Sequence, residues 1–325
     1  MQGYGRRCVW RLAGIAALGF VSLENSVSAA PHVVIAMTRG LQNHLIAPGT
    51  INGRPATFLV DTGAARTFVR ADRAAEFGIR PLEQQTREGG RLFRTGVVED
   101  LRIGGVRVGA NTVALYSAEQ LRGQVPGAGG KPADGLLGLD VLRRQRAVID
   151  CRSRRLVLPN RAAGSGATFA AGAAALGFTR IPMTLNRRGS LTVPCTINGR
   201  RGRLIVDTGT FVTGLDNDAA RALGLELTPS RLTARGFDGR VRPLELTRVQ
   251  DLRIGNVRIE PQQFAVIDIF GKRPARRAYI GLGRIEYYRA LQVPKEGPIY
   301  GLLGNELLDR HHGVIDLESM ALFLK

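Results

Sequence analysis

The sequence predicts an all-β protein made of two small domains related by an approximate two-fold axis, with a few short helices. Three observations lead to this fold class. The 325-residue chain repeats itself, each copy contains short β-branched runs separated by Asn-Gly or Gly-Gly pairs that are typical of hairpins, and a stretch rich in Gly and Ala separates the copies. A chain of this length also fits two domains.

The repeat is strongest in the segment that ends with the first Asp-Thr-Gly, at Asp61–Gly63. Ile35–Gly63 aligns without gaps on Ile181–Gly209, with 14 of 29 positions identical. Three shorter blocks recur in the same order: Asp100–Gly104 with Asp251–Gly255, Gly135–Gly138 with Gly301–Gly304, and Val148–Asp150 with Val314–Asp316. Four matched blocks in one order exclude chance, so we predict two copies of one folding unit.

The repeat and its flanks divide the chain into four segments. These are a signal peptide (1–30), an N-terminal half (31–159), a linker (160–177) and a C-terminal half (178–325). We expect a short helix after each Asp-Thr-Gly and after each Leu-Leu-Gly, at Asp72–Phe77, Asp218–Leu223, Asp140–Arg144 and Asn305–Asp309.

The first segment has the order of a secretory signal. Arg6, Arg7 and Arg11 precede an apolar run from Leu12 to Leu23, and small residues follow at Val27–Ala29. The run is shorter than the roughly 20 residues that cross a bilayer. We therefore expect an exported protein, periplasmic or secreted, with no stable membrane insertion once the signal is removed. The Arg6-Arg7 pair leaves both Sec and twin-arginine export open.

Two cysteines remain after the signal, Cys151 and Cys195. An oxidising compartment permits a disulfide between them, but they do not occupy matching positions in the repeat. Two buried thiols that pack as small hydrophobes are the alternative.

Each copy carries an apolar strand that runs directly into Asp-Thr-Gly, at Phe58–Gly63 and Leu204–Gly209. A carboxylate at the end of a buried strand is costly unless it is hydrogen-bonded or paired. A two-fold axis near these turns supplies the partner, because it brings Asp61 and Asp207 face to face. Two carboxyl groups in contact cannot both ionise, so they share one proton.

One shared proton provides one acid and one base. The charged carboxylate takes a proton from a water molecule while the neutral carboxyl donates one to a carbonyl oxygen. This chemistry hydrolyses a peptide bond without a metal or another cofactor. The sequence therefore predicts peptide hydrolysis by Asp61 and Asp207.

These segments resemble the retropepsin-like and pepsin-like aspartic proteases, in which Asp-Thr/Ser-Gly is followed at a distance by two apolar residues and Gly. The resemblance spans almost the whole chain after residue 30 and implies two retropepsin-like closed β domains with one catalytic pair, Asp61 and Asp207. It implies support of the dyad by Thr62, Gly63, Thr208, Gly209 and Thr210, and supporting strands at Leu136, Leu137, Gly138, Leu302, Leu303 and Gly304. Because one chain supplies both halves, we expect a monomer that acts on a peptide or protein substrate.

The two copies differ directly after the repeated glycine. Ala64 follows Gly63, whereas Thr210 follows Gly209 and has a hydroxyl to offer its aspartate. A hydrogen bond to the charged form lowers a pKa. Our hypothesis is that Asp207 is the more acidic member of the pair and that Asp61 usually holds the proton.

Two Gly-containing, Arg-rich hairpins are the candidates for flaps that cover a substrate, at 87–95 and 235–242. Their candidate residues are Gly89, Gly90, Phe93, Gly236 and Phe237. The arginines could favour acidic or anionic substrates. Alternatively, they are solvated side chains on surface loops. The insertion 269–300 is either an exosite or lid, or a surface excursion. The first repeat strand begins near Pro31, so we expect no prosegment.

The main alternative is a non-catalytic exported binding or scaffold protein that keeps the same fold. The net charge of +19 raises the question of a polyanion partner, but the sequence lacks helix-turn-helix and zinc-finger patterns, so we expect no nucleic acid. The four histidines, His32, His44, His311 and His312, do not form H-E-x-x-H, so we predict no metal site.

Overall fold

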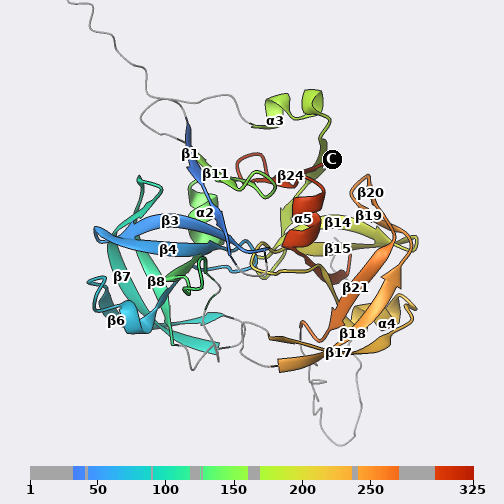
Figure 1. Cartoon of the computed structure of the whole chain (residues 1–325), viewed down its shortest axis with the longest axis horizontal. Coiled ribbons are helices and arrows are strands. Elements are labelled where there is room, and N and C mark those ends of the chain that lie inside the picture. Colours follow the sequence, from blue (N-terminus) through green and yellow to red (C-terminus); the bar gives the residue numbers. More distant parts are fainter. Residues whose placement is uncertain are drawn as a thin grey trace, which may run out of the picture.

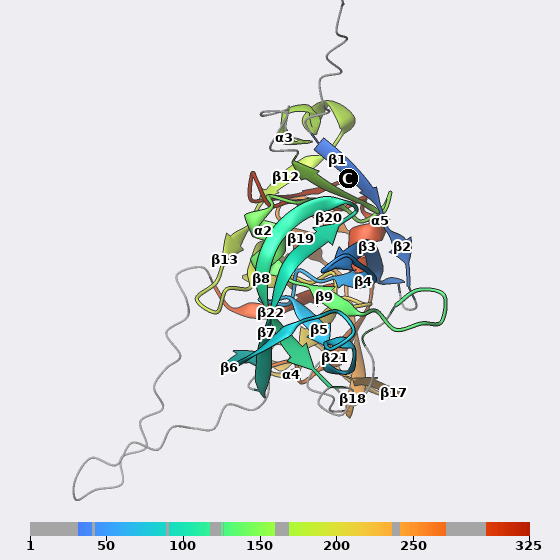
Figure 2. The same cartoon turned by 90° about the vertical axis from the view of Figure 1, so that its left-hand side faces the viewer.

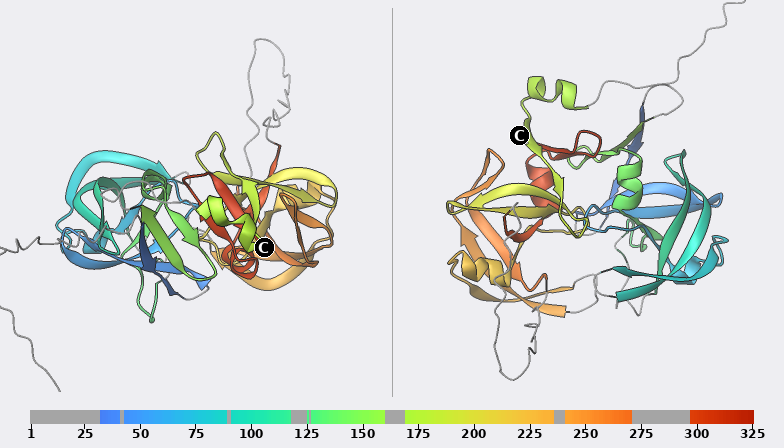
Figure 3. Two further views of the ribbon diagram at one scale, coloured as in Figure 1. Left: turned by 90° about the horizontal axis from the view of Figure 1, so that it is seen from above. Right: turned by 180° about the vertical axis from the view of Figure 1, so that it is seen from behind.

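Two β-rich halves lie side by side in the computed structural model, the N-terminal half to the left in Figure 1 and the C-terminal half to the right. Figure 3 shows the same two halves from above and from behind. The structure describes residues 32–40, 43–88, 91–117, 125, 127–159, 169–235, 241–270 and 297–325. The predicted all-β class with few short helices is confirmed. The predicted signal segment lies outside the described residues, as does most of the 269–300 insertion.

The N-terminal half is an eight-stranded sheet in the order β2-β3-β4-β9-β5-β8-β7-β6. An additional pairing of β3 with β7 closes this sheet on itself. Its strands are β2 (Thr38–Arg39), β3 (Leu45–Ile51), β4 (Arg54–Val60), β5 (Phe68–Arg70), β6 (Arg80–Glu88), β7 (Arg91–Ile103), β8 (Val106–Tyr116) and β9 (Gly135–Leu137).

The C-terminal half repeats this arrangement in a ten-stranded sheet, with β14 paired to β19 where the first half pairs β3 with β7. Its strands are β13 (Thr184–Leu185), β14 (Leu191–Ile197), β15 (Arg200–Val206), β16 (Gly214–Asp216), β17 (Thr228–Arg235), β18 (Val241–Val249), β19 (Leu252–Ile254), β20 (Val257–Ile259), β21 (Gln262–Ile267) and β22 (Ile299–Leu303).

A third sheet joins the halves and was not predicted from the sequence. Its order is β1-β11-β10-β23-β24-β12, with three strands from each half, and it lies at the top of Figure 1. The strands are β1 (His32–Ala36), β10 (Val148–Asp150), β11 (Arg155–Pro159), β12 (Thr179–Pro182), β23 (Val314–Asp316) and β24 (Ala321–Leu324). The repeated Val-Ile-Asp pairs with its own copy, since Ile149 lies opposite Ile315. The pseudo-two-fold axis therefore runs between these two residues.

Three of the four predicted helices form, as α2 (Leu139–Arg144), α4 (Asn217–Ala222) and α5 (Asn305–Arg310). The fourth, expected over Asp72–Phe77, is only a 3-10 turn, η2 (Ala71–Arg73). Figure 2 shows the N-terminal half face on, with β7 and β8 curving across it.

The C-terminal part of the predicted linker is packed. It contains α3 (Phe169–Gly172) and η4 (Ala174–Leu176), and the Phe169 ring lies edge-on to Phe178 and Phe323, with ring centroids 5.4 and 5.1 Å away. Phe169 therefore packs against the third sheet, although it lies within the predicted linker.

Both cysteines are buried free thiols, so the structure contains no Cys151–Cys195 disulfide. Burial raises the pKa of both thiols, that of Cys195 to about 12. Within the described residues, no helix is both long and apolar enough to cross a membrane.

Candidate active site

Each Asp-Thr-Gly follows a buried strand that is flanked by the repeated Leu-Leu. In the N-terminal half, β4 runs parallel to β9 with Val60 opposite Leu137, and the Leu137 carbonyl accepts the Asp61 N–H at 3.0 Å. In the C-terminal half, β15 runs parallel to β22, and the Leu303 carbonyl accepts the Asp207 N–H at 3.0 Å. The chain therefore leaves both strands at equivalent points, where each aspartate begins its loop.

The two loops are cross-braced by their threonines. The Thr62 hydroxyl donates to the Val206 carbonyl at 2.8 Å and accepts the Thr208 N–H at 3.1 Å. In the same way, the Thr208 hydroxyl donates to the Val60 carbonyl at 2.7 Å and accepts the Thr62 N–H at 3.0 Å. Both threonines are fully buried. Four bonds across the axis thus fix one loop against the other.

The glycines allow the two carboxyl groups to approach the opposite loop. A Cβ atom at Gly63 would overlap the carboxyl group of Asp207, and one at Gly209 would overlap that of Asp61. Each glycine N–H also donates to the aspartate of its own loop, at 2.8 Å in the first and 2.9 Å in the second. The geometry therefore places Asp61 and Asp207 in contact across the axis.

The surroundings of the two carboxyl groups differ. Burial, followed by the neighbouring charge of Asp207, raises the pKa of Asp61 well above its usual range, against the opposing N–H bonds from Gly63 and Ala64. Burial also raises the pKa of Asp207, but hydrogen bonds from the Gly209 N–H, Asp61 and the Thr210 hydroxyl lower it, as does His44. The opposing groups include the Thr210 hydroxyl on which our sequence hypothesis rests. The environment thus favours the proton on Asp61 and the charge on Asp207.

A second pair of braces was missed in the sequence. Thr67 donates to Asp140 from its hydroxyl at 2.7 Å, and the same hydroxyl accepts the Gly138 N–H at 3.1 Å. Thr213 and Glu306 occupy the same places in the second half, and the Thr213 hydroxyl accepts the Gly304 N–H at 2.9 Å. The available signal was their equal spacing from Asp-Thr-Gly and from Leu-Leu-Gly in both copies.

Two further side chains were also missed, and both hold the loop of Asp207. His44 Nε2 lies 3.0 Å from the Gly209 carbonyl oxygen, and Asn305 Nδ2 donates to the Thr208 carbonyl at 2.5 Å. The corresponding positions in the other half are Ser190 and Leu139. Because neither residue type repeats, no duplicated pattern pointed to them.

The two predicted flap regions form hairpins, β6–β7 and β17–β18, on the side of the molecule opposite the third sheet (Figure 1). Gly89, Gly90, Gly236 and Phe237 lie outside the described residues. Phe93 is fully buried and packs edge-on against Phe68, with ring centroids 5.0 Å apart. Phe93 pairs with Thr86 close to the turn of the hairpin, but its side chain is buried and not exposed to a substrate.

The first hairpin contacts the Asp61 loop directly. Glu88, at the end of β6, accepts the Ala65 N–H at 3.3 Å. Partial burial raises the pKa of Glu88, while this bond and Arg66 act to lower it. A carboxyl group thus lies beside the loop of Asp61, whereas nitrogen donors lie beside the loop of Asp207.

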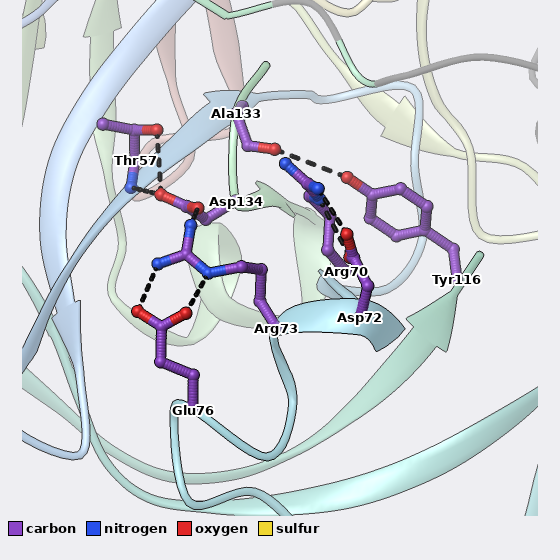
Figure 4. Close-up of polar contacts among 8 residues, drawn as sticks. All are labelled: Thr57, Arg70, Asp72, Arg73, Glu76, Tyr116, Ala133 and Asp134. Atoms are coloured by element: carbon purple, nitrogen blue, oxygen red, sulfur yellow. Dashed lines mark hydrogen bonds and ion pairs between the residues drawn. The ribbon is translucent and has the colours of Figure 1, made fainter. Parts of the chain in front are cut away.

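The outer ends of the supporting strands are held by different chemistry. Before β9, Asp134 accepts the Thr57 N–H at 2.9 Å and pairs with Arg73 at 2.6 Å, and Arg73 also pairs with Glu76 (Figure 4). At the matching position of β22 the residue is Tyr300, whose hydroxyl donates to the Arg201 carbonyl at 2.9 Å. An ionic network in one half thus corresponds to an aromatic ring in the other.

The chain belongs to the aspartyl protease family, which it matches over residues 47–141 and 193–307. Both matched segments contain one Asp-Thr-Gly and one Leu-Leu-Gly, so each half is one copy of the family's unit.

Two solved structures are similar over most of the chain. Basic 7S globulin from soybean is 13% identical with a TM-score of 0.49, over 90% of this chain and 94% of that one. The aspartic proteinase from Irpex lacteus is 13% identical with a TM-score of 0.48, over 90% and 96%. No curated protein sequence matches the chain significantly.

In the described ranges, no group of three or more His, Cys, Asp and Glu side chains is arranged to hold a metal ion. His311 and His312 follow α5, and His312 adopts a left-handed conformation with φ of 51°. Burial lowers the pKa of His311.

Proposed function

We propose that this protein is an aspartic endopeptidase that hydrolyses peptide bonds with Asp61 and Asp207 as its catalytic pair. The observation that carries the proposal is the contact of two acidic side chains across the axis, where each glycine leaves room only for the opposite carboxyl group. The cross-bracing threonines and membership of the aspartyl protease family support it.

The proposed reaction uses one proton on the pair. Asp207, charged, takes a proton from a water molecule, and the resulting hydroxide attacks the peptide carbonyl carbon while Asp61 donates its proton to the carbonyl oxygen. The tetrahedral intermediate then collapses: one of its hydroxyl groups returns a proton to Asp61 as the carbonyl re-forms, the C–N bond breaks, and Asp207 donates its proton to the leaving nitrogen. Asp61 is then protonated and Asp207 charged, as at the start of the cycle.

Export and oligomeric state belong to the same proposal. The basic residues and short apolar run of 1–30 support export. A single chain provides both aspartates, which supports a monomer that needs no second copy to complete the pair.

Cleavage of a diverse peptide library, from about pH 3 to pH 8, tests the proposed function. Asp61→Asn and Asp207→Asn should each lower kcat/KM by about 10³-fold or more, because each removes either the acid or the base. Asp251→Asn is the matched control, since this aspartate is 44% exposed and pairs only loosely with Arg253 at 3.8 Å. A statine-type inhibitor should block the wild-type protein.

Two results would contradict the proposal. Cleavage that persists in both dyad variants would exclude this pair as the catalytic groups. If the folded wild-type protein cleaves no peptide at any pH, the non-catalytic binding or scaffold function becomes the better account.

A further inference from the structure

His44 reaches the dyad from the opposite half of the molecule. It precedes β3, its side chain is only 4% exposed, and its Nε2 lies 3.0 Å from the carbonyl oxygen of Gly209. A carbonyl oxygen only accepts hydrogen bonds, so Nε2 carries a proton and donates it. A side chain of the N-terminal half thus holds the loop that carries Asp207.

The pseudo-two-fold axis does not repeat this contact. The repeat aligns His44 with Ser190, whose N–H donates to Asn186 at 3.0 Å. Among the described residues, no bond joins Ser190 to Gly63. The His44 contact therefore distinguishes the Asp207 loop from its otherwise matched copy.

A second donor acts on the preceding peptide unit. Asn305, the first residue of α5, donates to the Thr208 carbonyl at 2.5 Å. The Gly209 N–H of that same peptide unit donates to Asp207 Oδ1 at 2.9 Å. Donation to a peptide carbonyl polarises the peptide, which strengthens the bond that its N–H makes on the other side.

His44 acts on the next peptide unit in the same way. The Gly209 carbonyl that it binds belongs to the peptide whose N–H is that of Thr210, and this N–H bonds the Asp207 backbone carbonyl at 3.3 Å. A fixed peptide fixes Thr210, whose hydroxyl is a donor to the Asp207 carboxyl group. The groups that face this carboxyl are Asp61, the Gly209 N–H, the Thr210 hydroxyl and His44.

We infer that His44 is a positioning residue of the dyad, which holds the Gly209–Thr210 peptide from the opposite half and so keeps the donors of Asp207 aimed at its charged form. This inference rests on the proposed peptidase function. His44 does not touch the reacting atoms in this account. It acts through the loop, and its direct electrostatic effect on Asp207 has the same sign, because it favours the charge there.

Three variants separate positioning from general loss of structure. His44→Leu removes the donor, His44→Gln offers a side-chain N–H in its place, and Ser190→Ala alters the matched position of the other half. We expect His44→Leu to lower kcat about tenfold with KM nearly unchanged, which is the cost of one buried hydrogen bond. The acidic limb of its kcat/KM profile should move to higher pH, because Asp207 becomes harder to ionise.

His44→Gln should recover most of the lost kcat, and Ser190→Ala should behave as wild type. Wild-type kinetics for His44→Leu would overturn the inference. So would equal damage in the leucine and glutamine variants with an unmoved acidic limb, since that pattern indicates a packing role alone.

Hydrogen exchange tests the same inference without any substrate. Amides of 204–212 should exchange at least about tenfold faster in His44→Leu than in wild type, while those of 58–66 keep their rate. If His44→Leu does not fold, His44→Gln carries the test and must exchange like wild type in 204–212. Unchanged exchange in the leucine variant, or faster exchange in the glutamine variant, contradicts the inference. If wild type cleaves no peptide, the proposed function fails, and this exchange result still decides whether His44 holds the loop.

Discussion

The loops around Asp61 and Asp207 share their sequence and their cross-bracing but not their surroundings. Side-chain donors hold the Asp207 loop through His44 and Asn305. The Asp61 loop instead meets a carboxyl group, that of Glu88, on the Ala65 N–H. The halves therefore differ where they face each other. This difference makes the acidities of the two carboxyl groups unequal, whereas a perfect repeat would make them the same.

The proposed mechanism needs one acid and one base, and both must come from aspartate side chains. Two identical sites in contact still share one proton, but nothing then determines which carboxyl holds it. Donors beside Asp207 and a carboxyl group beside the Asp61 loop bias that choice. The comparison indicates that repetition builds the frame and that unrepeated residues assign the roles.

After the two aspartates themselves, the largest effect is expected at the repeated glycines, where the two halves are still the same. Gly63→Ala and Gly209→Ala should each lower kcat/KM by at least about a hundredfold, because the new methyl group overlaps the opposite carboxyl and forces the loops apart. Steady-state kinetics with a thermal melt of each variant measures this. Near-normal activity in either variant would mean that the carboxyl groups do not meet as described.

A smaller effect should distinguish the outer ends of the supporting strands. Asp134→Asn should lower the free energy of unfolding by about 2 kcal/mol, because Asp134 accepts the Thr57 N–H and pairs with Arg73. Tyr300→Phe should lower the free energy of unfolding by about 1 kcal/mol, since it removes one hydrogen bond and keeps the ring. Urea unfolding compares the two. Equal losses would show that the ionic network adds nothing to the first half.

The smallest effect is expected at Thr210. Its hydroxyl acts to lower the pKa of Asp207, so Thr210→Ala should raise that pKa and move the acidic limb of kcat/KM to higher pH. Thr210→Ser keeps the hydroxyl and is the matched control. An acidic limb that stays in place in Thr210→Ala removes this residue from the account.

The internal repeat made the frame predictable. Matched blocks predicted two all-β halves, and the two Asp-Thr-Gly sequences predicted which residues would meet. The third sheet was not predicted, because the pairing of Val148–Asp150 with Val314–Asp316 is a non-local contact that neither copy specifies alone.

Unrepeated residues escaped prediction for a different reason. His44 directly follows the polar residues Gln42 and Asn43 in the sequence, a pattern typical of a solvated surface, and only the fold buries it against Gly209. Phe93 was expected on a flap, but its side chain packs inward because alternate residues of a strand face opposite sides. The helix expected after Phe68–Arg70 shortens to one 3-10 turn, and Arg73 from that turn contacts Asp134.

In the proposed mechanism, the two halves hold one proton between unequal carboxyl groups. Carbon-13 NMR of labelled aspartate side chains, followed from about pH 2 to pH 8, measures it most directly. We expect two well-separated ionisations from the coupled pair, with the resonance of Asp207 changing most in the first and that of Asp61 in the second, each assigned with the corresponding Asp→Asn variant. Simultaneous ionisation of both residues near the ordinary aspartate pKa, about 3.9, would contradict the account.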